Sequence, residues 1–467
     1  MPNFEPPALF VLEIPVTPHA FGRVAVALLT ISACSDSATS LSEIPALTTP
    51  TCTLLAQAVA GPAVVVAAGD RSQGDPRIVA LSGGGFAIAW VDYEDVGDED
   101  VWVRVYDSAG EPLGDAVRAN TFASYGQYLP TLTALAGGGF VVGWESTPYH
   151  WQDEPTQDGS GSGVYARFFD AAGDPIGDEV RVHVENDRDQ GQLDVSALAD
   201  GGAIFVWWSA TDLLKSPGPT QGFGFRSVVR ARRFDAMGVA QTDELLVADT
   251  VLQENLETEP DQPSVAGLDD GGWAVTWTRA RLRPDGEYRV PYPRTLQGRR
   301  FGADDAPLGP AFQVSQEPRN LFSDEYASRV VGLPGSSFAV AWLASRTQGK
   351  GAVQRRFDAS GFPRAGEEVS SGWLTGGSVD DVGQAPIPGF GALVSWNVSE
   401  GGDYSLGLQA LDAHGEPLDL EPWTWTFDGS RPEARAALLT DGALVVGYRE
   451  TAEDFKGDIA FQRFVCP

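Results

Sequence analysis

The sequence contains few of the side chains that most often bind metals or act as nucleophiles. Its 467 residues include only four histidines, three cysteines and two methionines. Three histidines follow residue 33, namely His150, His183 and His414, and no two of them have the spacing of a metalloprotease motif. No nucleophile elbow, phosphate-binding glycine loop or dinucleotide fingerprint occurs either. The sequence therefore argues against serine–histidine catalysis and multi-histidine metal chemistry.

Positive charge is also scarce. The chain has 32 Lys and Arg against 64 Asp and Glu, a formal net charge of −32. Because nucleic acid would be repelled and no basic stripe compensates, we expect no nucleic-acid partner. Anionic membrane surfaces are disfavoured for the same reason. The charge fits a cationic partner or simple solubility.

Long apolar runs are missing after residue 33, so no later segment is apolar enough to span a bilayer. The composition also does not favour helices. With 54 Gly, 32 Pro and 13 Trp, the chain has the composition of many short strands joined by tight turns.

The first 34 residues carry an export pattern. Arg23 precedes the apolar run 24–31, which is followed by Ser32, Ala33 and Cys34. This segment resembles the bacterial lipoprotein signal, and the resemblance implies that Cys34 becomes the acylated N-terminus of an exported, outer-membrane or cell-surface lipoprotein. Residues 1–33 would be the signal segment and residues 34–57 a Ser/Thr/Pro-rich tether, with the lipid as the only membrane contact.

One pattern repeats through the rest of the chain. A glycine-rich turn leads into a strand that ends in an aromatic residue, as in Gly83–Trp90 and Gly137–Trp144. Successive copies are about 52 to 70 residues apart, which is the range of one propeller blade. The seven terminal aromatics are Trp90, Trp144, Trp207, Trp277, Trp342, Trp396 and Tyr448.

Strand periodicity assigns these aromatics to the core. Phe86, Ile88 and Trp90 fall on one face of a strand, whereas Ala87 and Ala89 fall on the other. A large face next to a small face is what blade stacking needs, so we interpret the tryptophans as core residues. Each copy continues to an Arg-Phe-Asp-like strand end and a turn with Gly and Pro, and we interpret that repeated Asp as a structural turn residue.

The segment Gly138–Trp144 together with Gln157–Asp170 resembles a repeat found in tandem in large bacterial secreted and cell-surface proteins. The resemblance covers about residues 58–467 and implies a fold and a location but no activity. We therefore predict an all-β protein, a seven-bladed β-propeller of four-stranded antiparallel blades.

The last copy stops after its third strand, at residues 459–465. The strand at residues 63–68 aligns with the outer strand of another copy, so the N-terminal strand is predicted to complete the last blade and close the ring. Cys52 and Cys466 lie at the two ends of that blade, and two cysteines in an exported chain are expected to pair. We predict a Cys52–Cys466 disulfide.

Function is assigned to the face that carries the loops between second and third strands, because these loops are long and variable. Their side chains are acidic and aromatic, which suits sugars or cationic peptides, or alternatively only solvated loop packing. The Asp158-Gly-Ser160 segment is oxygen-rich and could contribute to a calcium site, although it lacks EF-hand spacing. No other cofactor is expected. The candidate ligand-binding residues are Tyr93, Asp95, Tyr149, Trp151, Asp153, Glu154, Tyr288 and Tyr326.

These observations favour a monomeric, non-enzymatic surface protein that binds an extracellular glycan or a cationic protein segment. The alternative is a secreted propeller enzyme acting on polysaccharide, a glycosidase or lyase. Its carboxylate pair would come from different blades, and such a pair leaves no linear motif.

Overall fold

A computed structural model describes most of the chain after residue 58. The chain divides into two compact units, residues 1–49 and residues 50–467, and every described residue belongs to the second. The described ranges are 59–67, 71–93, 99–148, 157–186, 188–214, 224–249, 251–253, 256–282, 294–316, 324–364, 366–387, 389–418, 422–427, 433–451 and 457–465.

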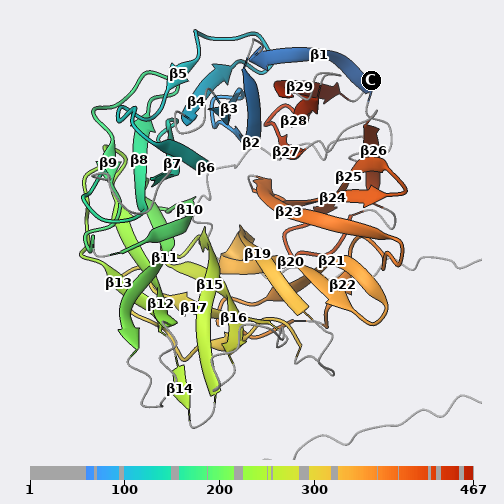
Figure 1. Ribbon diagram of the computed structural model, residues 1–467. Helices are drawn as coiled ribbons and strands as arrows, with labels where there is room; N and C mark the ends of the chain where they lie inside the picture. Colours follow the sequence, from blue (N-terminus) through green and yellow to red (C-terminus); the bar gives the residue numbers. More distant parts are fainter. Residues whose placement is uncertain are drawn as a thin grey trace, which may run out of the picture. The chain divides into compact units, whose positions relative to one another are not determined.

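Seven antiparallel sheets form a ring of blades around a common centre (Figure 1). Blade 1 contains β2 (Ser72–Ala80), β3 (Phe86–Tyr93), β4 (Glu99–Tyr106) and β5 (Val117–Arg118). Blade 2 contains β6 (Gly126–Ala134), β7 (Phe140–Thr147), β8 (Gly163–Phe169) and β9 (Val180–Arg181). Blade 3 contains β10 (Gln190–Ala197), β11 (Ala203–Leu214), β12 (Gly224–Phe234) and β13 (Leu245–Asp249).

Blade 4 contains β14 (Val251–Gln253), β15 (Leu256–Gly267), β16 (Trp273–Leu282), β17 (Thr295–Phe301) and β18 (Phe312–Gln313). Blade 5 contains β19 (Asp324–Leu333), β20 (Ser337–Arg346), β21 (Gly349–Phe357) and β22 (Glu368–Val369). Blade 6 contains β23 (Gly377–Ile387), β24 (Gly391–Glu400), β25 (Asp403–Leu411) and β26 (Trp423–Phe427). Blade 7 contains β27 (Arg435–Leu438), β28 (Leu444–Thr451), β29 (Gly457–Val465) and β1 (Val59–Ala67).

The prediction that the N-terminal strand closes the ring is confirmed. β1 pairs antiparallel with β29, with Val59 opposite Val465 and Ala67 opposite Ile459. The last blade is therefore built from both ends of the chain. Cys34, Cys52 and Cys466 lie outside the described residues, so the lipid anchor and the disulfide stay predictions.

Two details differ from the expected blade. Blade 4 has a fifth strand, because β14 pairs with β15 through Val251 and Thr258. In blade 3 the loop between the second and third strands is shorter than we expect from the sequence, because β11 and β12 stay paired as far as Leu214 and Gly224. Polar Thr211 and Asp212 interrupt the apolar alternation there, although the backbone ladder continues. Within the described ranges the only helix is a 3-10 turn at Pro334–Ser336, so none of them supplies a helix that could cross a membrane.

Blades pack with the large face of one sheet against the small face of its neighbour, as the strand periodicity predicts. Ala87 and Ala89 of blade 1 contact Phe140, Val142 and Trp144 of blade 2 in one buried cluster. The opposite face of β3 packs on blade 7. All seven repeated aromatics are at most 7% exposed, which confirms their place in the core.

The Arg-Phe-Asp strand ends are also structural. In five blades the Asp Oδ1 accepts the N–H groups two and four residues later, at Asp107, Asp170, Asp235, Asp358 and Asp412. In four blades an Arg two residues before the strand-end Phe donates to a carbonyl of the preceding blade. These contacts are Arg167 to Ala119 (3.4 Å), Arg232 to Val182 (3.1 Å), Arg299 to Val247 (2.9 Å) and Arg355 to Val314 (2.9 Å).

Candidate functional site

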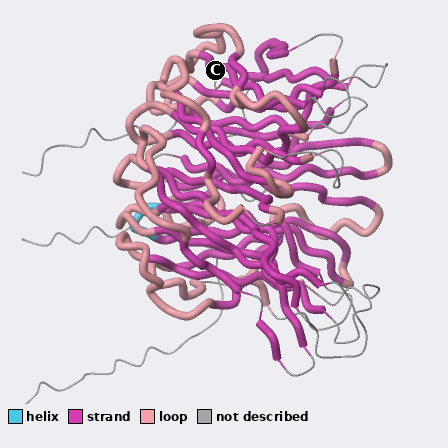
Figure 2. The backbone as a smooth tube through the Cα atoms, turned by 60° about the vertical axis from the view of Figure 1, so that its left-hand side comes forward, coloured by secondary structure: helices cyan, strands magenta, loops and turns pink. Residues whose placement is uncertain are grey.

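The face predicted to carry function is the one where second strands lead into third strands. In blade 1, Ser72 at the start of the first strand pairs with Tyr93 at the end of the second. The start of each first strand therefore lies on this face, and its end leads into the glycine-rich turn on the other. Figure 2 shows the strands running between these two sets of turns.

Most of the predicted ligand-binding residues lie outside the described part of the chain. These are Asp95, Tyr149, Trp151, Asp153, Glu154 and Tyr288. Tyr93, Tyr326, Asp158 and Ser160 are described. Their surroundings show what the sequence prediction found and what it missed.

Tyr93 ends the second strand of blade 1 and contacts the first strand of the same blade. Its hydroxyl donates to Asp75 Oδ2 at 2.9 Å. Burial and the Asp75 carboxylate both raise the pKa of Tyr93, so the phenol stays protonated at neutral pH. Tyr93 is partly exposed and can present a ring face next to a charged group.

Tyr326 occupies the corresponding end of blade 5, in the first strand. The Arg294 guanidinium lies 4.4 Å from the centroid of its ring and pairs with Asp324 at 2.6 Å. Tyr326 directly precedes Ala327, which has a left-handed backbone with φ 52°. Asp75, which accepts from the Tyr93 hydroxyl, also has a left-handed backbone with φ 52°. Both described aromatic candidates therefore lie next to a left-handed residue near the start of a first strand.

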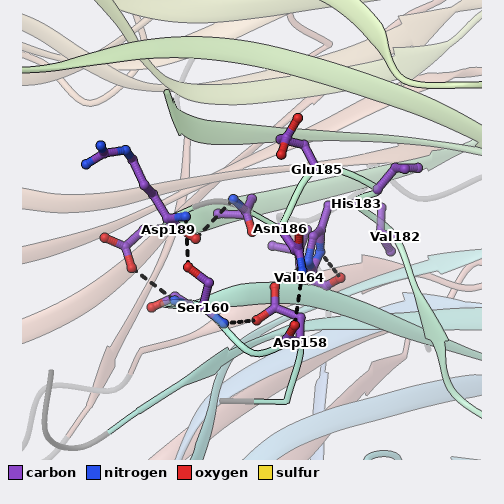
Figure 3. Close-up of polar contacts among 12 residues, drawn as sticks. Asp158, Ser160, Val164, Val182, His183, Glu185, Asn186 and Asp189 are labelled. Carbon is purple, nitrogen blue, oxygen red and sulfur yellow. Dashed lines mark hydrogen bonds and ion pairs between the residues drawn. The ribbon is translucent and has the colours of Figure 1, made fainter. Parts of the chain in front are cut away.

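Asp158 and Ser160 lie in a buried polar cluster of blade 2 (Figure 3). Asp158 Oδ2 is 2.7 Å from His183 Nε2, and both side chains are almost fully buried. His183 Nδ1 accepts the Val164 N–H at 3.2 Å, so we assign the ring proton to Nε2. Ser160 Oγ accepts the Arg188 N–H at 3.1 Å. Within the described residues no group of three or more His, Cys, Asp and Glu is placed to hold a metal.

The His183 contact has counterparts in other blades. In each case a side chain that follows the fourth strand accepts an N–H at the start of the third strand, nineteen residues earlier. We therefore assign His183 to blade architecture and not to chemistry. The four acceptors are Asn120 for Val101, His183 for Val164, Ser315 for Leu296 and Ser371 for Ala352.

A β-bulge recurs near the start of the first strand. In five blades two residues of this strand stand opposite the single repeated Trp of the second strand. The first of the two lies fifteen residues before the aromatic, and we call this the bulge position. Its φ is positive in six blades although none of these residues is glycine, and non-glycine residues in this region are strained. They are Asp75, Leu129, Gln192, Gln262, Ala327 and Glu433.

Hydrogen bonds between blades hold this strained backbone in place. In four blades the N–H at the bulge position donates to a side chain of the preceding blade. The pairs are Asp75 to Glu433 Oε2 (3.0 Å), Gln192 to Glu145 Oε1, Gln262 to Gln192 Oε1 (2.8 Å) and Ala327 to Gln262 Oε1 (3.0 Å). A belt of polar contacts thus links successive blades around much of the ring.

We call the residue that lies two positions after the bulge position the inner position. It lies thirteen residues before the repeated aromatic. Figure 1 shows the first strands around the centre of the ring. Although the adjoining core is apolar, this position holds a polar residue or glycine in every blade. The residues from blade 1 to blade 7 are Arg77, Thr131, Asp194, Ser264, Arg329, Gly383 and Arg435.

Blades 5, 6, 7 and 1 form the basic side of this arrangement. Arg329, Arg435 and Arg77 occupy the inner position, while blade 6 contributes Asp381 from its bulge position. Arg435 pairs with Asp381. Burial would raise the pKa of Asp381, but Arg435, Arg329 and Arg77 together hold it below its usual value. Asp381 is therefore an ionised carboxylate that pairs with Arg435 and is also stabilised by the charges of Arg329 and Arg77.

Blades 2, 3 and 4 form the opposite side and carry carboxyl groups with raised pKa. Burial raises the pKa of Glu145 to about 7, despite N–H groups donated by Gln192 and Leu193. Burial also raises the pKa of Asp261, which accepts a hydrogen bond from the Gln192 side chain. Gln192 therefore links two carboxyl groups that retain protons more readily than usual.

The sequence prediction missed this inner ring because it looked for recognition in long loops. Nothing about an isolated Arg77 between Pro76 and Ile78 marks it as functional. The signal was the fixed spacing from the repeated aromatic, which places Arg77, Arg329 and Arg435 at one position of three blades. Only an extension of the repeat alignment from the second strand to the preceding first strand could have found this inner position.

The fold and this inner ring define the chain as a seven-bladed β-propeller with a polar centre. No protein-family model and no curated protein matches the sequence. A crystal structure of a protein of unknown function from Dyadobacter fermentans is similar with a TM-score of 0.52 at 10% identity, covering 88% of this chain and 100% of that chain. This likeness shows a shared fold.

Weaker likenesses include the following two enzymes. Polysaccharide lyase Uly1 has a TM-score of 0.44 at 8% identity, covering 82% of this chain and 88% of that chain. The GH93 α-L-arabinofuranosidase of Fusarium graminearum has a TM-score of 0.42 at 9% identity, covering 73% and 93%. At these values neither likeness bears on the activity of this chain.

Proposed function

We propose that this protein is an exported, lipid-anchored propeller that binds an extracellular carbohydrate at the bulge end of its first strands. The single observation that carries the proposal is the inner ring. Six of the seven blades place a polar side chain at the inner position, and the seventh, blade 6, places Asp381 two residues away. Convergent polar groups on a rigid scaffold are the usual basis of small-molecule recognition.

The chemistry of this ring suits a sugar. Guanidinium and hydroxyl groups donate to ring and hydroxyl oxygens, and the carboxylates and amide oxygens accept from sugar hydroxyls. Tyr93 and Tyr326 add partly exposed aromatic rings in blades 1 and 5. A cationic protein segment fits this centre less well, because it would meet Arg77, Arg329 and Arg435.

A glycan array with the full chain tests the proposal. We expect retention of at least one carbohydrate, with binding reduced by Tyr93→Ala and Tyr326→Ala and largely kept by Tyr93→Phe. His414→Ala is the matched control, because His414 is exposed in a turn on the opposite face. Absence of binding to every carbohydrate on the array, or an equal loss of binding in His414→Ala, would contradict carbohydrate binding at this end.

Cleavage of the bound carbohydrate is the second candidate function. The observation that favours it is the raised pKa of Glu145, about 7, together with the raised pKa of Asp261, to which Gln192 links it. A carboxyl group that holds its proton near neutral pH is suited to act as a general acid on a glycosidic bond. If the array ligand is turned over, Glu145→Gln should lower turnover by about 100-fold or more while binding is kept.

A further inference from the structure

We infer that Arg77, Arg329 and Arg435 form an anion-recognition site, and that the ligand is an acidic carbohydrate carrying a carboxylate or a sulfate ester. The inference rests on the proposed function and specifies its substrate class. It is carried by the position, pairing and accessibility of the three arginines.

The three arginines are equivalent by position and by conformation. Each occupies the inner position of its blade, and each donates from Nη1 to the carbonyl oxygen of the preceding residue. These distances are 3.0 Å from Arg77 to Pro76, 3.1 Å from Arg329 to Ser328 and 3.1 Å from Arg435 to Ala434. The three guanidiniums are thus anchored in the same way at equivalent positions of three blades, and Arg435 also donates from Nη2 to Asp381.

Within the described ranges, only one of the three guanidiniums has a carboxylate at ion-pair distance. Arg435 pairs with Asp381, but neither Arg77 nor Arg329 forms an ion pair with an acidic residue in the described ranges. Asp75 of the neighbouring bulge position already accepts from Tyr93. This shortage of ion pairs is unexpected in a chain with 64 acidic and only 32 basic residues, where carboxylates are plentiful.

The charges also lie close enough to repel one another. Burial lowers the pKa of Arg77 to about 10, and the charges of Arg435 and, less strongly, Arg329 lower it as well, whereas the charges of Asp75 and Asp381 raise it. An anion placed among them would relieve this repulsion and replace the water lost on burial. All three arginines keep some exposure to solvent, although only 12% of the Arg435 side chain is exposed, and a small ligand approaching from solvent would therefore meet Arg77 and Arg329 first.

Blade 6 leaves room for this arrangement. Gly383 replaces a side chain at the inner position, and a Cβ there would lie 3.5 Å from Arg435 Cδ and 2.5 Å from Ser395 Oγ. A larger residue would occupy the space over which Arg435 reaches Asp381. The guanidinium forks match planar carboxylates and the oxygens of sulfate in bidentate contacts.

Calorimetric titration of the full chain tests the inference with two anionic probes, D-glucuronate and inorganic sulfate, and with neutral D-glucose. We expect at least one anion to bind at least tenfold more tightly than glucose. Arg77→Gln and Arg329→Gln should each weaken that anion about tenfold to a hundredfold, as loss of a charged hydrogen bond does. Preference for glucuronate would indicate a uronate ligand, and preference for sulfate a sulfated one.

Arg118→Gln is the matched control, because Arg118 carries the same charge but lies on the outer strand of blade 1. Circular dichroism confirms that each variant is folded. Equal binding of glucose and both anions, or equal weakening by Arg118→Gln, would overturn the inference. Capture of only neutral glycans on the array would overturn it and leave the proposed function standing, whereas anion binding without any glycan capture would support the anion site and contradict the proposed function.

Discussion

The two faces of the propeller behave differently along the repeat. On the face of the glycine-rich turns, the same contacts recur with the same residues, as in the Asp turns that follow the third strand in five blades. At the bulge end, the backbone recurs but the inner position changes among Arg, Thr, Asp, Ser and Gly. Residues that recur in every blade are those that blade stacking requires. Where the backbone recurs but the side chains vary, the seven blades together form one asymmetric site.

The largest expected effect on stability concerns the closing blade, because both faces of the propeller exist only while the ring is closed. Mass analysis of the non-reduced mature protein should find Cys52 joined to Cys466 and Cys34 acylated. A bridge that encloses nearly the whole propeller should stabilise it by up to about 5 kcal/mol, because it restricts the unfolded chain. Reduction should lower the free energy of unfolding accordingly. Two free thiols would contradict the disulfide and leave the pairing of β1 with β29 unaffected.

The next effect tests the recurring side of the comparison. Trp144 is fully buried and stands opposite the bulge of blade 2. Trp144→Ala should lower the free energy of unfolding by about 3–5 kcal/mol, as deletion of a buried aromatic does. Leu113→Ala is the control, because Leu113 is 56% exposed in a turn and should change stability little. Similar losses in the two variants would refute the core assignment of the repeated aromatics.

These recurring features explain why the sequence predicted the fold well and the site poorly. Trp90 and Ala89 alternate with strand period, and each blade repeats this, so local pattern and fold agree. The site residues Arg77, Arg329 and Arg435 come from different blades and reach one level only when the blades stack into a ring. The bulge position two residues before each of them interrupts strand alternation, so period-two patterning cannot say which way they face.

Glu145 gives a test that depends on pH. Its pKa is raised from 4.5 to about 7 in the folded protein, so the folded state holds a proton that the unfolded state releases between these values. Stability from this group is therefore present below about pH 4.5 and lost as pH rises through about 7. Glu145→Gln keeps an acceptor for the Gln192 N–H and should stabilise the protein by about 1–3 kcal/mol at pH 8, with little effect at pH 4. Denaturant unfolding at the two pH values measures the difference, and an equal shift at both would contradict the raised pKa.

The smallest effect separates two arginines that the sequence alone would treat alike. Arg232 donates to the Val182 carbonyl of the preceding blade at 3.1 Å, whereas Arg77 donates to the carbonyl of its own neighbour Pro76 and lies near Arg435 and Arg329. Arg232→Gln should therefore cost about 1 kcal/mol, because it removes a contact between blades. Arg77→Gln should leave the free energy of unfolding unchanged or raise it by up to about 1 kcal/mol, because it removes a repelled and partly desolvated charge. If Arg77→Gln lost as much stability as Arg232→Gln, Arg77 would be a structural residue that stabilises the ring. The distinction between a recurring scaffold and a variable inner position would then not hold for Arg77.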